Sequence, residues 1–111
     1  MPFIINMEEP GTWRAEWPEA SSFVEGTVVT AKRRSEIMTD NVQRGKANLF
    51  EANLQTIVEH VTSWEGFEDG EGNEVNLKSA AVLSVMPPAV LDTILMKITG
   101  GMVEEVADPL S

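Results

Sequence analysis

Residues 12–30, TWRAEWPEASSFVEGTVVT, decide the fold class of this chain. A first strand is predicted at residues 12–17, where Trp13, Ala15 and Trp17 alternate with more polar side chains and therefore share one face. Alternation with a period of two is typical of a strand that buries one face. The sequence thus predicts a β-sheet with an apolar face near the N-terminus.

The partner strand is predicted at residues 22–30, which are rich in β-branched types. Pro18 ends the first strand because it has no N–H to give to a ladder, and residues 18–21 have the composition of a turn. Two strands alone are marginal in water. The antiparallel hairpin therefore needs a helix to pack on, or a third strand, for which residues 3–5 are the candidate.

The rest of the chain is predicted to be helical, which gives an α+β fold with a small N-terminal antiparallel sheet packed on three to four short helices. Thr30 and Asn48 are suitable N-caps for helices over residues 31–41 and 49–63, because their side chains can accept hydrogen bonds from the first turn. The apolar stripe of the second helix is interpreted as core and contains Phe50, Leu54, Ile57, Val58, Val61 and Trp64.

Two local features allow more than one interpretation. Gly45 costs about 1 kcal/mol relative to alanine inside a helix, so residues 42–47 can be a break, a loop or a helix that tolerates the glycine. The basic residues 32–34 can form a contact patch on an acidic surface. We favour a solvated helix face that is paired with nearby carboxylates.

The C-terminal half is set by residues 64–102, WEGFEDGEGNEVNLKSAAVLSVMPPAVLDTILMKITGGM. After the glycine-rich turn a helix is predicted over residues 77–85, and it ends at Met86 because the following proline disfavours helical backbone there. Pro88 is well placed in the first turn of a last helix, and Gly100 begins its C-terminal stop. The apolar stripe of this last helix contains Val90, Leu91, Ile94, Leu95 and Ile98.

Neither a metal site nor a catalytic site is expected. A calcium loop beginning at Asp69 would need Gly at its sixth position and Glu at its twelfth, where this chain has Glu74 and Ala80. The one histidine, His60, has no second His or Cys to build a site with. The turn is too polar to shift a carboxyl pKa for acid–base catalysis. We therefore expect a protein that is no enzyme and binds no cofactor or metal.

Size and composition limit the remaining possibilities. At 111 residues the chain is predicted to be one domain, residues 1–102, followed by an acidic flexible tail, residues 103–111. No apolar run is long enough to cross a membrane, and residues 1–9 lack the basic region of a secretory signal. The absence of cysteine suits a reducing cytoplasm.

Charge also bears on the partners. The formal net charge is −10, from 18 acidic and 8 basic residues. We expect no nucleic-acid binding, because lysine and arginine would have to displace the counterions of the phosphates. Two interpretations of the acidity are open: it only keeps the protein soluble, which we favour, or it also steers the protein towards a basic partner.

The order of features in residues 64–102 resembles the C-terminal half of small tail assembly chaperones from long-tailed bacteriophages. Those proteins often carry a W-x-G and D-x-x-G turn, a short helix, a proline break and a last helix, and here Trp64, Gly66, Asp69 and Gly72 match the turn. The resemblance implies a non-catalytic protein of the host bacterial cytoplasm. Its partner would be the helical tape-measure protein, kept soluble until tail-tube subunits polymerise around it, and the tail-tube protein is a possible second partner.

The candidate partner-binding surface is the apolar face shared by the last two helices. Methionine adapts to irregular partner surfaces, which favours the two methionines near the last helix. The expected binding residues are Trp64, Val82, Leu91, Leu95, Met96 and Met102.

Two other functions remain open. A structural virion component, such as a small tail or head–tail joining protein, would stay in purified particles, whereas a chaperone leaves. An acidic inhibitor that mimics nucleic acid would carry carboxylates at phosphate-like spacing and bind in a salt-sensitive manner. A homo-oligomer is compatible with each function.

Overall fold

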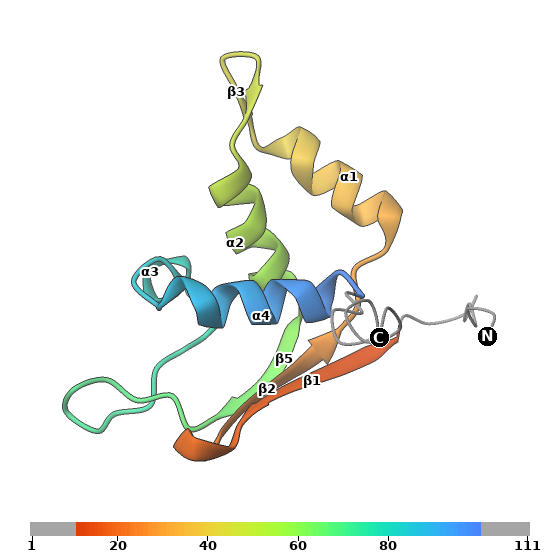
Figure 1. Cartoon of the computed structure of the whole chain (residues 1–111). Helices are drawn as coiled ribbons and strands as arrows, with labels where there is room; N and C mark the ends of the chain where they lie inside the picture. Colours follow the sequence, from red (N-terminus) through yellow and green to blue (C-terminus); the bar gives the residue numbers. More distant parts are fainter. Residues whose placement is uncertain (1–10, 101–111) are drawn as a thin grey trace, which may run out of the picture.

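The α+β class is confirmed by a three-stranded antiparallel sheet and helices that cover it (Figure 1). The computed structural model describes residues 11–100, so the candidate third strand at residues 3–5 and the predicted tail at residues 103–111 lie outside the described part. The elements are β1 (Thr12–Trp17), η1 (Pro18–Ala20), β2 (Ser22–Thr27), α1 (Ala31–Asp40), β3 (Val42–Gln43), β4 (Lys46–Ala47), α2 (Leu49–His60), β5 (Val61–Glu65), α3 (Ala80–Leu83) and α4 (Pro88–Ile98).

The sheet has the strand order β1-β2-β5, and both pairs are antiparallel. In the predicted hairpin, Trp13 pairs with Gly26 and Trp17 with Ser22. The third strand, β5, differs from the prediction, which places its first residues at the end of the preceding helix. Val61 is β-branched and fits a strand, and the neighbouring β2 supplies its partner, because Val61 pairs with Gly26.

The end of α2 is held by a lysine from a distant part of the chain. Lys78 Nζ donates hydrogen bonds to the main-chain carbonyls of Val58 (2.5 Å) and Val61 (2.7 Å). The last carbonyls of a helix have no partner within it, so a cation that reaches them stabilises this terminus. This contact helps α2 end at His60, three residues before the predicted end.

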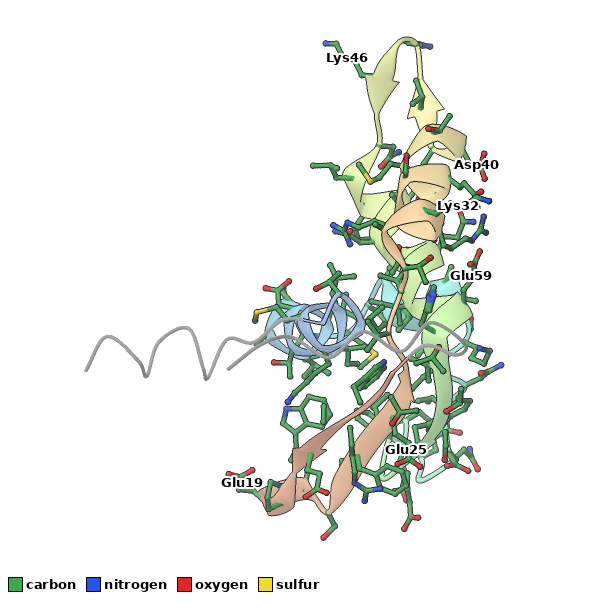
Figure 2. The ribbon with its side chains drawn as sticks, turned by 90° about the vertical axis from the view of Figure 1, so that its right-hand side faces the viewer. Glu19, Glu25, Lys32, Asp40, Lys46 and Glu59 are labelled. Carbon is green, nitrogen blue, oxygen red and sulfur yellow. The ribbon has the colours of Figure 1, made fainter. Side chains whose placement is uncertain are left out.

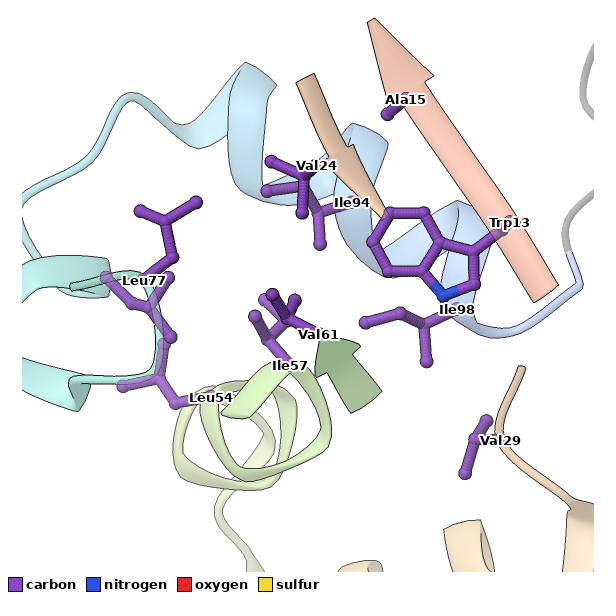
Figure 3. Close-up of a cluster of buried hydrophobic side chains, with 11 residues drawn as sticks. Trp13, Ala15, Val24, Val29, Leu54, Ile57, Val61, Leu77, Ile94 and Ile98 are labelled. Atoms are coloured by element: carbon purple, nitrogen blue, oxygen red, sulfur yellow. The ribbon is translucent and has the colours of Figure 1, made fainter. Parts of the chain in front are cut away.

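The core lies between the sheet and the helices α2 and α4, and α4 crosses over the sheet (Figures 1 and 3). The predicted stripe of α2 is only partly core: Leu54 and Ile57 are buried, but Phe50 is 51% exposed. Phe50 lies in the first turn of α2, towards the end farther from the sheet. The buried core residues are Trp13, Ala15, Val24, Val29, Leu54, Ile57, Val61, Leu77, Leu83, Ile94 and Ile98.

The helices α1 and α2 form an arm that projects away from the sheet and ends in the small hairpin of β3 and β4 (Figure 1). Thr30 and Asn48 cap these helices as predicted, accepting from the main-chain N–H groups of the third helical residues. The weak segment is a break: Arg44 and Gly45 both have positive φ (53° and 77°), as a tight two-residue hairpin turn requires.

Ion pairs hold the two helices of the arm together. Arg33 donates to Glu59 through Nε (2.8 Å) and Nη2 (2.5 Å), and it also pairs with Glu36. Arg33 is the middle residue of the basic cluster at residues 32–34. Its pairing with carboxylates on a partly solvated helix face agrees with the interpretation given above for this cluster. Lys32 is exposed on the same helix (Figure 2).

The helix predicted over residues 77–85 is shorter than expected, because α3 is a single turn. Leu77 is fully buried in the core, and the chain reaches α3 only after this residue has packed. Ser79 then caps α3 by accepting from the N–H of Val82 at 3.4 Å. Within residues 11–100, no helix is both long and apolar enough to span a membrane.

Candidate functional site: an apolar groove with an acidic edge

An apolar groove of about 550 Å³ lies between η1, the connection from β5 to α3, and the junction of α3 with α4. Its volume is comparable to that of pockets that bury small ligands, about 300–1,000 Å³. Most of its lining is aliphatic or aromatic. The apolar side chains of the lining belong to Trp17, Ala20, Phe67, Val75, Val82, Val85, Met86, Pro87 and Val90.

One wall of the groove is built on the end of the hairpin. Trp17 is the last residue of β1 and contacts Phe67 edge to face, with ring centroids 5.9 Å apart and planes at 87°. The connection that carries Phe67 is fixed to the sheet because Trp64 Nε1 donates to the carbonyl of Val75 (3.0 Å). The N–H of Val75 in turn donates to the carbonyl of Phe67 (2.9 Å). This wall is therefore held by hydrogen bonds as well as by packing.

A glycine permits the close approach that starts this wall. Gly66 has φ of +88°, and its carbonyl accepts a hydrogen bond from Ser22 Oγ at 2.8 Å. A Cβ at this position would lie 2.6 Å from the main-chain oxygen of Ser21. Residues with a side chain rarely adopt this φ, and here the space is also filled. The W-x-G pattern thus places the chain where it can turn away from the sheet.

The opposite wall is built on the proline break. Pro87 has extended backbone (φ −58°, ψ 135°), so α3 and α4 are separate helices that meet at an angle (Figure 1). Val85, between them, is 82% exposed and lines the groove together with Met86. Full burial of a valine side chain is favourable by about 1.5–3 kcal/mol of free energy relative to leaving it in water. An open groove that leaves Val85 in water is therefore suited to binding an apolar group.

Carboxylates occupy only one side of the groove. Glu19 from η1 and Glu68 and Asp69 from the β5–α3 connection line it, while the wall formed by α3 and α4 contributes no charged residue. Glu65 and Glu74 line an adjoining hollow. Neither lining contains a lysine or arginine, and within residues 11–100 none of the ion pairs involves these carboxylates.

Asp69 is kept ionised by its own turn. Its carboxylate accepts hydrogen bonds from the main-chain N–H groups of Asn73 (3.0 Å) and Glu71 (2.8 Å). These two bonds lower the pKa of Asp69 because they stabilise the charged form. Gly72 in the same turn has φ of +87°, and a single antiparallel bridge joins Glu68 to Glu74.

The residues predicted to bind a partner are spread over adjoining hollows. Val82 lines the groove, and Leu91 and Leu95 line a neighbouring hollow of about 310 Å³ between α2 and α4, which shares Met86 with the groove. Met96 is 40% exposed and lines a further hollow beside Arg34, which shares Leu95 with the second.

The two other predicted residues lie elsewhere. Trp64 is half-buried on β5 and packs against the core, with its indole N–H bonded to Val75. Met102 lies outside the described residues. Sequence reasoning missed Trp17, Phe67 and Val85; the signal for Val85 was an apolar residue directly before Met86 and the two prolines.

Metal-binding groups or the histidine would add other chemistry to the groove if they lay near it. Within residues 11–100, no group of three or more His, Asp or Glu side chains is arranged to hold a metal ion. His60 lies on the arm, where its Nδ1 is 2.9 Å from the carbonyl of Thr56. The groove therefore presents apolar contact area and negative charge.

Comparison of the chain with protein-family models, curated proteins and solved structures gives no match.

Proposed function

We propose that this protein is a tail assembly chaperone of a long-tailed phage or prophage, which binds the tape-measure protein in the host bacterial cytoplasm and keeps it soluble. The observation that carries the proposal is the open apolar groove, because most of its lining comes from the same residues 64–102 that resemble such chaperones. A client that aggregates through apolar surface needs a partner that covers this surface without catalysis. The groove, with Val85 in water, offers such a contact.

The proposal is tested by co-expression with the tape-measure protein encoded nearest to the gene of this chain. The client should be soluble with the chaperone and insoluble without it. Binding should weaken little as salt rises, since buried apolar contacts are not screened. A client that stays insoluble in both cases, or a chain that remains in purified phage particles, would refute the proposal, and the latter result would identify a structural virion component.

The net charge of −10 and the carboxylates beside the groove favour one alternative, an acidic inhibitor that mimics nucleic acid. Such an inhibitor would bind a basic protein through charge–charge contacts, so its affinity would collapse in salt and would survive the loss of apolar side chains in the groove. The same salt series therefore separates the two functions.

A further inference from the structure

We infer that the groove of one molecule binds the arm tip of a second copy, so that the chain associates head to tail. The arm tip is defined as residues 42–50, VQRGKANLF, which comprise the β3–β4 hairpin and the start of α2. This inference goes beyond the proposed function, because it concerns contacts between copies rather than with a client. Both contacts would use the same groove, so a bound tip and a bound client exclude each other. Exposed apolar area, complementary charge and the position of the two surfaces all support it.

Exposed apolar side chains are concentrated at these two places. Within residues 11–100, the exposed large apolar residues are Val42, Leu49, Phe50, Val85 and Met96. The first three belong to the arm tip and are 48%, 59% and 51% exposed, and Val85 belongs to the groove. Association would remove part of this apolar area from water, which favours the contact.

The two surfaces also carry opposite charge. The arm tip contains Arg44 and Lys46 and no acidic residue, although the chain as a whole has 18 acids against 8 bases. Both cations are exposed, and within residues 11–100 neither forms an ion pair. The groove has carboxylates and no cation in its lining. A positive apolar tip and a negative apolar groove are complementary, which fixes orientation and speeds association.

The contact has to form between molecules rather than within one. Figure 1 places β3 at one end of the molecule and the β5–α3 connection at the other, and Figure 2 shows Lys46 and Glu19 at opposite ends. The β3–β4 hairpin of the tip therefore cannot reach the groove of its own molecule, whereas Phe50, at the base of the tip, lines a hollow that shares Met86 with the groove. Because the tip and the groove are different surfaces, the contact is heterologous, and each associated pair leaves one tip and one groove free.

The inference is tested by sedimentation velocity of the whole protein over a range of concentrations. Two variants at exposed positions each disable one surface: Val85→Asp in the groove and Leu49→Asp in the arm tip. Leu49 is the first residue of α2, where a negative charge favours the helix dipole, so the fold should be kept. The wild type should form dimers and larger species, and each variant alone should associate at least about tenfold more weakly.

Mixing the two variants is the decisive step. The Val85→Asp protein keeps its tip and the Leu49→Asp protein keeps its groove, so an equimolar mixture should form dimers and nothing larger. A symmetric contact would use the same surface on both copies and would not be rescued in this way. The inference is overturned if the wild type stays monomeric, if either variant associates like the wild type, or if the mixture stays monomeric.

A matched pair of charge reversals tests the electrostatic part. Lys46→Glu places a negative charge on the tip and should weaken wild-type association several-fold. Lys32→Glu changes the same charge on α1, outside the tip, and should have no comparable effect. Equal effects of both would show that only net charge matters and would overturn the pairing of tip and groove. Failure of self-association leaves the client-solubility assay unaffected, so the two proposals fail separately.

Discussion

At the scale of single residues, the sheet depends on Gly26, a glycine within strand β2 rather than in a turn. Gly26 lies at the irregularity where the register between β2 and β5 shifts. A Cβ added there would lie 1.8 Å from the main-chain oxygen of His60, at the point where α2 passes into β5. The missing side chain lets two main chains approach closely.

Gly26→Ala should therefore destabilise the protein by about 3 kcal/mol, the upper part of the usual range for overpacking, because main chain rather than a flexible side chain must move. Gly70→Ala is the matched control: nothing lies within 4 Å of the added Cβ, so its effect should stay within about 0.5 kcal/mol. Urea unfolding at equilibrium measures both. Similar free energies for the two variants would contradict the close approach.

A second residue-scale prediction concerns the Arg33–Glu59 pair of the arm. Hydrogen bonds from Arg33 lower the pKa of Glu59 to about 2, from an ordinary value of 4.5. The folded pKa is depressed, so the stabilisation by the charged carboxylate is complete above about pH 4.5 and is lost as the pH falls towards 2. Glu59→Gln should lower the urea midpoint at neutral pH and should reduce the loss of stability on acidification.

Glu36→Gln provides a comparison for this prediction, since Glu36 contacts the same arginine through a single, longer bond of 3.2 Å. Its effect on the acid transition should be smaller. If both variants follow the wild-type pH dependence, Glu59 is not responsible for the acid sensitivity of the arm.

At the scale of elements, Trp64 links β5 to the connection that forms one wall of the groove. Its ring packs against the core, and its N–H reaches Val75 eleven residues later in the chain. The sequence pattern places Trp64 at the end of a helical apolar stripe and predicts that its side chain anchors the core. The anchor lies on a strand instead, and its hydrogen bond holds the wall that carries Phe67 in place.

Trp64→Ala should lower the free energy of unfolding by about 3 kcal/mol, because most of a large apolar contact is lost. Trp64→Phe keeps a ring and loses only the hydrogen bond to Val75, so it should cost about 1 kcal/mol. Urea midpoints of the two variants separate packing from hydrogen bonding. Unchanged stability of Trp64→Ala together with lost client binding would make Trp64 a surface contact rather than an anchor.

At the scale of the whole molecule, the structure distributes the predicted client residues over adjoining hollows. The groove contains Val82 and Val85, whereas Met96 lies near the C-terminal end of α4 and lines another hollow. Leu95 is half-buried and packs against the core, so a charge there would test folding rather than binding. Val85 and Met96 are both exposed and are better positions for a test.

Val85→Asp should abolish solubilisation of the co-expressed client, while Met96→Asp should leave it intact, because only Val85 lies in the groove. Thermal melts of both variants should match the wild type, which shows that the fold is kept. The opposite pattern would move the client site to Met96 on α4, which also belongs to the surface expected from the sequence.

The sequence by itself determined those features whose causes are local. Alternating side chains defined β1 to the residue, and the side chains of Thr30 and Asn48 defined where the arm helices begin. The proline break separated the last two helices, since proline restricts the backbone before it. For the candidate site, the sequence supplied Val82 and the apolar face of the last two helices, but not the groove.

The tertiary structure decided what depends on partners far apart in the chain. β5 is a strand because β2 lies beside it, and a helical pattern cannot reveal that neighbour. Phe50 fits the helical stripe, yet it is exposed because the arm carries the first turn of α2 away from the sheet. The groove joins Trp17 to Val85 across most of the chain. Local periodicity states which face of an element is apolar, whereas only the packing of the elements determines which apolar groups remain in water.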